Sequence, residues 1–293
     1  LLLRTNRFGP MEQGFLARLR SETGFAVAVV ADETAAPLDC GAFGKISVTR
    51  RAASRLGLYC PRDFAWRCGD YGLYLARHEM PEIEHFWVIE PDVRAATANY
   101  GDLFRQFDPY PEVDLVGFDL RRSEPDHWWH ATMRQRTGEV YRCLFGLARF
   151  SARALDVCVA ERRRDVRNMW ARLFWPNDET FTATVLVAAG LIVKDANDCG
   201  RPLHTAESFS YWTPFRGEDF EATAHEGLVY HPVLWGDDYE RRIARLERHP
   251  RLEQLRMKLL RAVMVKGYHR RVGLGRILAR PRPIPAYPLT DRP

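Results

Sequence analysis

Two carboxylates follow an apolar, β-rich segment of this chain at a spacing that suits cation binding. Glu90 and Asp92 come directly after the buried strand expected at 85–89. Mg²⁺ and Mn²⁺ prefer such oxygen ligands, together with substrate phosphate. Acids also follow strands simply because loops are polar, so this pair alone leaves both interpretations open. Other acids at expected strand ends are Asp32, after the run at 25–31, and Asp119, after the strand expected at 114–118.

A second acidic pattern opens a helix expected at 179–189. Asn177 or Asp178 suits the N-cap position and Glu179 the first turn, where acidic side chains favour the positive end of the helix dipole. A carboxylate that faces a cleft from a helix start can also act as a general base towards a hydroxyl. The spacing does not separate capping from catalysis.

A histidine completes the set of candidate functional residues. His231 lies inside a late strand expected at 229–233 and is followed by Pro232. Its imidazole could complete a metal site with Glu90 and Asp92, bind a phosphate directly, or serve as a structural core residue. The pattern leaves these three roles open.

Several common catalytic motifs are missing from the chain. It contains no G-x-S-x-G, no Walker Gly-Lys-Ser/Thr and no G-x-G-x-x-G after a strand, which argues against serine hydrolases, P-loop enzymes and dinucleotide oxidoreductases. The six cysteines include no C-x-x-C pair. We therefore expect reduced thiols in a cytoplasmic protein and no zinc site built on cysteine.

The elements that must position these residues alternate between strands and helices. This order predicts an α/β three-layer sandwich with a mostly parallel central sheet, in which ligands bind outside the carboxyl ends of strands. The expected strands cover 1–4, 25–31, 45–49, 85–89, 114–118, 140–150, 191–193 and 229–233, and the expected helices cover 10–22, 69–78, 151–164, 179–189 and 239 to about 266.

Charge divides the chain into two parts. Residues 241–293 contain 15 Lys and Arg against 3 Asp and Glu, whereas residues 1–240 contain 28 against 35. We expect a catalytic domain at 1–240 and a basic helical C-terminal extension at 241–293, and no nucleic-acid partner for the acidic body. The basic and apolar residues of 241–280 could lie on an anionic membrane surface or pack one face on the body. No membrane span or signal peptide is expected, so the predicted location is cytoplasmic or peripheral on the inner face of a membrane.

Three stretches resemble GT-A-type glycosyltransferases. Phe86-Trp-Val-Ile-Glu-Pro-Asp-Val-Arg94 resembles a Tyr-Trp-x-x-Glu-Tyr-Asp-Val strand of uncharacterised putative glycosyltransferases. Trp175-Pro-Asn-Asp-Glu-Thr180 resembles the Asp-Glu element of core-2/I-branching-like enzymes, and Tyr230-His-Pro-Val233 resembles their His-Pro element. The acidic pair here is Glu-Pro-Asp in place of Asp-x-Asp.

The resemblance implies transfer of a sugar from a nucleotide-sugar donor to a hydroxyl of a glycan or lipid-linked glycan, as in polysaccharide biosynthesis. It implies an inverting reaction with Glu179 as the base and Asp178 as its substitute. Mn²⁺ or Mg²⁺ would bind Glu90, Asp92 and His231. The residues expected to bind the donor are Thr5, Asn6, Arg7, Asp32, Arg94 and Asp119. Core-2-like enzymes dispense with a metal and neutralise the diphosphate with basic side chains, and Arg94, Arg121 and Arg122 could do the same here.

Other functions fit parts of the same pattern. A nucleotidyltransferase or another metal-assisted phosphoryl-transfer enzyme also needs a carboxylate pair and a cation. A non-catalytic nucleic-acid-binding protein would use the basic tail. Four aromatic residues in expected loops could stack on sugar rings, although packing is the commoner fate of a tryptophan; they are Trp128, Trp129, Tyr211 and Trp212.

Overall fold

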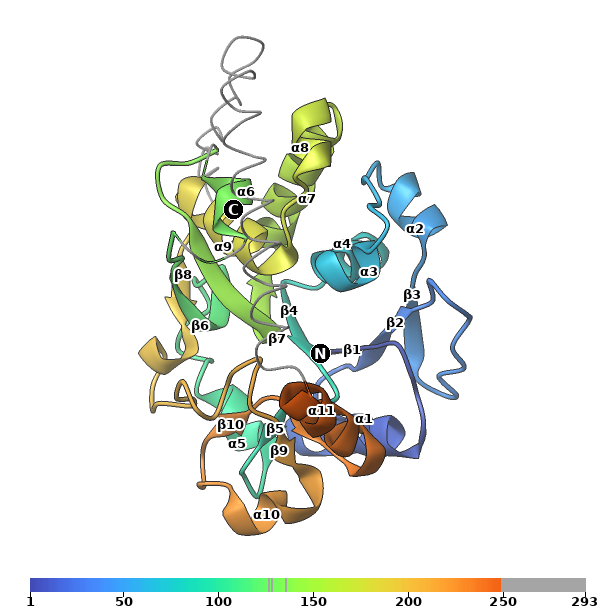
Figure 1. The fold of residues 1–293 in the computed structure, drawn as a ribbon, viewed down its shortest axis with the longest axis vertical. Helices are drawn as coiled ribbons and strands as arrows, with labels where there is room; N and C mark the ends of the chain where they lie inside the picture. Colours follow the sequence, from blue (N-terminus) through green and yellow to red (C-terminus); the bar gives the residue numbers. More distant parts are fainter. Residues whose placement is uncertain (126, 128, 135, 249–293) are drawn as a thin grey trace.

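The computed structural model describes residues 1–125, 127, 129–134 and 136–248 (Figure 1). Its strands are β1 (Leu2–Thr5), β2 (Ala28–Asp32), β3 (Gly44–Val48), β4 (His85–Ile89), β5 (Arg94–Ala95), β6 (Leu115–Arg122), β7 (Tyr141–Ser151), β8 (Val193–Asp195), β9 (Phe215–Arg216), β10 (Val229–Tyr230) and β11 (Val233–Leu234). Its α-helices are α1 (Pro10–Thr23), α2 (Arg50–Arg55), α3 (Phe64–Arg67), α4 (Asp70–Glu79), α5 (Tyr100–Arg105), α6 (His130–Met133), α7 (Ala152–Val166), α8 (Met169–Leu173), α9 (Asp178–Ala188), α10 (Phe220–Thr223) and α11 (Gly236–Arg248).

Seven of the described strands form one central sheet in the order β3-β2-β1-β4-β7-β6-β8. Only β7 runs antiparallel to its neighbours; the other pairings in this sheet are parallel. Helices cover both faces of the sheet (Figure 1), so the predicted α/β three-layer fold with a mostly parallel sheet is confirmed.

Alternating side chains on the first strands build two separate cores. Leu3 and Val29 point to one face of the sheet and pack with α1 and α5, where Leu16 and Phe104 are buried. Adjacent Leu2 points to the other face, which α4, α7 and α9 cover. This period-two alternation is typical of strands that are buried on both faces by helices.

The strand expected at 114–118 continues well past its predicted end. Strand β6 runs to Arg122, so Asp119 lies within the strand and not after it. The pairing of β6 with β7 is irregular on both sides of Phe118, and Asp119 adopts a φ of 51°. The expectation that Asp119 follows the end of a strand was therefore wrong. The pairing of β6 with β7 continues past Asp119, although aspartate usually ends a strand.

The late strand expected at 229–233 is divided in two. β10 pairs with β5 and β11 pairs with β9, and His231 and Pro232 lie between them. His231 forms a single bridge with Phe209. This break places the imidazole at a turn of the chain and not on a continuous strand.

Helix α11 runs across the boundary expected between residues 240 and 241. The rest of the helix expected to reach about residue 266, and most of the proposed membrane surface at 241–280, lies outside the described residues. Within the described part, no helix combines the length and apolar character needed to cross a membrane. All six cysteines are free.

Candidate functional site

A cleft of about 500 Å³ opens at the carboxyl ends of β1, β2 and β4. Parallel strands bring these three ends to the same edge of the sheet, which explains why residues distant in sequence meet there. Nineteen residues line the cleft: Arg4, Thr5, Asn6, Arg7, Met11, Asp32, Thr34, Arg50, Arg62, Asp63, Phe64, Ala65, Trp66, Glu90, Pro91, Asp92, Val233, Leu234 and Trp235.

Glu90, Asp92 and His231 form an acidic triad at one end of this cleft. Each residue offers one potential ligand atom, and these atoms lie within 4.8 Å of one another. His231 Nε2 lies 3.9 Å from Glu90 Oε2 and 3.7 Å from Asp92 Oδ2. These separations are too long for hydrogen bonds, but they leave room for a cation that all three atoms contact. Two carboxylates and one imidazole therefore fit Mn²⁺, and Mg²⁺ with less preference.

A backbone contact fixes the orientation of His231. Its Nδ1 lies 2.9 Å from the carbonyl oxygen of Ser210, which can only accept a hydrogen bond. Nδ1 therefore carries a proton, and Nε2 is left to face the two carboxylates. In metal sites of proteins, a hydrogen bond from the other ring nitrogen, like this one from Nδ1, orients the metal-binding imidazole. Burial raises the pKa of Asp92, against the opposing effect of His231.

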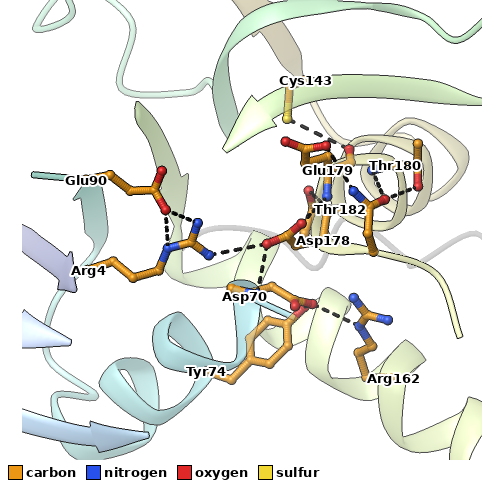
Figure 2. Close-up of polar contacts among 12 residues, drawn as sticks. Arg4, Asp70, Tyr74, Glu90, Cys143, Arg162, Asp178, Glu179, Thr180 and Thr182 are labelled. Atoms are coloured by element: carbon orange, nitrogen blue, oxygen red, sulfur yellow. Dashed lines mark hydrogen bonds and ion pairs between the residues drawn. The ribbon is translucent and has the colours of Figure 1, made fainter. Parts of the chain in front are cut away.

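Arg4 joins the acidic triad to the start of helix α9 (Figure 2). Its Nε lies 3.0 Å from Glu90 Oε1, and Nη2 contacts the same oxygen. Its Nη1 lies 3.3 Å from Asp178 Oδ2. Burial lowers the pKa of Arg4, but Glu90 and Asp178 outweigh this effect and hold the pKa above its ordinary value. Sequence analysis missed Arg4, although a charged residue within an apolar strand was a signal.

The Arg4–Asp178 contact depends on a glycine. A Cβ at Gly69 would lie 1.1 Å from Arg4 Nη1 and 2.6 Å from Asp178 Oδ2. The amide of Gly69 also donates a 2.8 Å hydrogen bond to Asp178 Oδ2. Burial nevertheless raises the pKa of Asp178 to about 7, against the opposing charge of Arg4.

Glu179 is also buried at the start of α9. Asn177 caps the helix through a 3.2 Å hydrogen bond from the amide of Thr180, and its Nδ2 donates to Glu179 Oε2 at 2.9 Å. Burial raises the pKa of Glu179 well above its ordinary value, and the charge of Asp178 adds to the effect. Asp178 and Glu179 both lie outside the set of residues that line the cleft. Asp178 contacts Arg4, and Arg4 lines the cleft.

A second ion pair lies behind this cluster. Arg162 Nε donates to Asp70 Oδ2 at 2.9 Å, and neither side chain is exposed to solvent (Figure 2). Arg162 also donates to the carbonyl of Pro176 and stacks on the ring of Phe181 at 3.7 Å. These contacts tie α4 and α7 to the loop that precedes α9, and so hold the start of α9 in place.

The expected donor-binding residues fall into two groups. Thr5, Asn6, Arg7 and Asp32 line the cleft. Arg94 does not belong to the lining: its guanidinium lies between the rings of Phe15 and Trp235, at 3.8 and 4.7 Å. Asp119 is also absent from the lining and forms ion pairs with Arg121 and Arg142, while Arg122 pairs with Glu139.

One wall of the cleft was not anticipated from the sequence. It consists of Arg50 and residues 62–66, and Arg50 donates hydrogen bonds to the carbonyls of Cys60 and Arg62. Trp66 on this wall is 65% exposed. A tryptophan in a short irregular segment was the available signal, but it does not reveal which sheet edge the segment covers.

No protein-family model and no curated protein matches this chain. Among solved structures, the chain is similar to the apo form of mouse xyloside xylosyltransferase 1. The sequence identity is 11%, the TM-score is 0.39, and the alignment covers 78% of this chain and 96% of that chain. At this level the likeness concerns the backbone and says nothing about substrates.

Proposed function

We propose that this protein is a glycosyltransferase that moves a sugar from a nucleotide-sugar donor to a hydroxyl acceptor. The observation that carries the proposal is the acidic triad at one end of the cleft formed by the ends of β1, β2 and β4. Glu90, Asp92 and His231 would hold Mn²⁺ or Mg²⁺ there. A bound divalent cation would neutralise the negative charge that develops on the leaving diphosphate.

The residues of the cleft floor would bind the nucleotide. Thr5 ends β1, Asn6 and Arg7 follow it, and Asp32 ends β2. Asp32 accepts hydrogen bonds from the amide and hydroxyl of Thr34, which hold its carboxylate in place. Arg7 is held by Glu12 and Asp238, so its guanidinium is oriented before any ligand arrives.

The carboxylates of α9 would supply the base. The bond between the anomeric carbon and the diphosphate oxygen breaks, the acceptor oxygen bonds to that carbon, and the acceptor proton passes to the base. Glu179 is the proposed base, with Asp178 as its substitute. Burial raises the pKa of Asp178 to about 7, and a base works best when its pKa is close to the working pH. Burial and the charge of Asp178 also raise the pKa of Glu179.

Product analysis with doubly labelled nucleotide-sugars tests the proposal. The full chain is incubated with a donor panel and mixed glycan acceptors, in Mn²⁺ and in EDTA. Release of a nucleoside diphosphate together with a glycosylated acceptor supports sugar transfer. Release of pyrophosphate with transfer of the nucleotidyl group would instead identify a nucleotidyltransferase. Thermal stabilisation by the same nucleotide-sugars reports binding independently of turnover.

Attachment to an anionic membrane is a separate proposal, which would bring a lipid-linked acceptor to the cleft. It is supported by the basic and apolar composition of residues 241–280. Flotation of the full chain with vesicles containing phosphatidylserine tests it, and uncharged vesicles are the control. Equal flotation with both vesicle types, or none with either, would contradict an electrostatic attachment.

A further inference from the structure

Two neighbouring aromatic side chains stay exposed near the acidic triad. Trp212 is 60% exposed and Tyr211 is 38% exposed. By contrast, Trp129 is 4% exposed, and its ring lies 6.2 Å from that of Trp66. Trp128 lies outside the described residues. Neighbouring exposed aromatic side chains are typical of binding surfaces, because their rings gain free energy when a ligand buries them.

Backbone hydrogen bonds tie this pair to His231. The amide of Ser210 donates to the carbonyl of His231 at 3.0 Å, and the amide of His231 donates to the carbonyl of Ser208 at 2.9 Å. The carbonyl of Ser210 also accepts the hydrogen bond from His231 Nδ1. The segment that leads to Tyr211 is therefore fixed relative to the proposed cation ligand.

Further hydrogen bonds fix Tyr211 and the residues that follow Trp212. The amide of Phe215 donates to the carbonyl of Pro232 at 2.9 Å, and Arg242 of α11 donates to the carbonyl of Tyr211. The ring of Tyr211 meets the imidazole of His231 edge-on, with 6.1 Å between centroids. A ring stacked on this pair would therefore lie beside the acidic triad.

The pair lies outside the cleft that would hold the donor. Tyr211 and Trp212 do not belong to its lining, whereas Trp66 does. A ligand that fills the cleft thus leaves both side chains available to a second molecule. The contacts of Ser210 and Tyr211 with His231 place this segment next to the acidic triad, whose carboxylates Glu90 and Asp92 line the cleft.

We propose that Tyr211 and Trp212 form the acceptor subsite and that the acceptor is a carbohydrate. This inference rests on the proposed function. A pyranose ring presents a face of C–H groups with hydroxyls around its rim, and the negative face of an aromatic ring attracts such C–H groups. A sugar ring that stacks on Trp212 and contacts Tyr211 would lie near His231, because the ring of Tyr211 contacts that imidazole.

Carbohydrate binding to the full chain tests the inference without requiring catalysis. The probes are neutral trisaccharides of glucose, galactose, xylose and N-acetylglucosamine, measured by saturation-transfer NMR and titration, with and without a nucleoside diphosphate and Mn²⁺. Trp212→Ala should weaken binding of the preferred trisaccharide by about two- to tenfold, since one ring contact to an aromatic side chain is typically worth that much. Trp212→Phe should restore part of the affinity.

Met169→Ala is the matched control, because Met169 is 67% exposed on α8, at the opposite end of the molecule from β9 (Figure 1). Unchanged trisaccharide affinity in Trp212→Ala, or no trisaccharide binding by the wild type, would overturn the inference. So would loss of self-association in Trp212→Ala, which would identify a contact between copies of the chain. Turnover is measured separately: in Trp212→Ala the acceptor KM should rise more than the donor KM. Trisaccharide binding without any donor turnover would contradict the proposed function and leave a carbohydrate-binding surface.

Discussion

Arg4 and Asp178 meet across 174 positions of sequence, with 3.3 Å between Nη1 and Oδ2. The same guanidinium contacts Glu90, so one partly buried side chain connects the proposed cation site to the helix that carries the proposed base (Figure 2). This relationship makes the two halves of the site dependent on one side chain of β1.

Replacing Arg4 should destabilise the fold. Arg4→Ala leaves Glu90 and the buried Asp178 without their shared partner. Removing one member of a fully buried pair typically costs about 3–5 kcal/mol, and we expect a smaller loss here because Arg4 and Glu90 keep some contact with solvent. Arg4→Lys should recover only part of this loss, because an ammonium cannot bridge both carboxylates as a planar guanidinium does. Denaturant unfolding measures the effect, with Arg51→Ala on the exposed face of α2 as control. Similar unfolding free energies for Arg4→Ala and Arg51→Ala would contradict this account.

A single methyl group at Gly69 should have a comparable effect. The new Cβ would overlap Arg4 Nη1, so the guanidinium must leave Asp178. We expect a loss of about 1–3 kcal/mol or more, as for other overpacked cores. Gly14→Ala in α1 is the opposite control, since nothing lies within 4 Å of its Cβ and alanine favours a helix by about 1 kcal/mol. The two glycine variants should therefore shift the unfolding free energy in opposite directions.

Asp178 should make stability fall as pH rises. Its pKa is about 7 in the folded protein and 3.8 in the unfolded chain, so between these values the folded state keeps a proton that the unfolded state has lost. Stability then decreases by up to about 1.4 kcal/mol for each pH unit in this range. The unfolding free energy of wild type minus that of Asp178→Asn should decline between pH 4 and 8. Asp237→Asn, in the exposed first turn of α11, is the control, and a rising difference for Asp178→Asn would refute the assignment.

Removing one ligand of the acidic triad should weaken Mn²⁺ binding. Asp92→Asn and His231→Ala should each lower the affinity at least about tenfold, because even loss of an outer contact to a metal ligand costs that much. Isothermal titration and EDTA-sensitive thermal shifts provide the measurement. His225→Ala removes an exposed histidine of the same region and should bind Mn²⁺ as the wild type does. Equal affinity in all three variants would place the cation elsewhere.

Glu179→Gln should abolish sugar transfer and preserve nucleotide-sugar binding. The amide keeps an oxygen that accepts from Asn177, so the helix start should stay intact while the base is lost. Loss of a general base typically lowers the rate by about 10²–10⁴. Steady-state kinetics and thermal shifts measure the two effects separately, with the exposed Glu82→Gln as control. A fully active Glu179→Gln enzyme would exclude this residue as the base and direct attention to Asp178.

Local patterns were sufficient for much of the architecture. The apolar run 85–89 is a strand with the bounds that the sequence predicted, and Asn177 caps α9 as its side chain suggests. These elements are predictable because strand and helix formation depends on residues that are close in the sequence. The acids after β4 lie with the other strand ends because parallel strands run in the same direction.

The tertiary structure alone decided which distant side chains meet. Sheet order brings Arg4 of β1 beside Glu90, which follows β4, and the packing of α9 on β7 sets Asp178 against Gly69. It also left Trp212 exposed while it buried Trp129, although both are tryptophans in expected loops. Side-chain burial and pairing depend on what the rest of the chain places opposite a residue, and no local spacing contains that information.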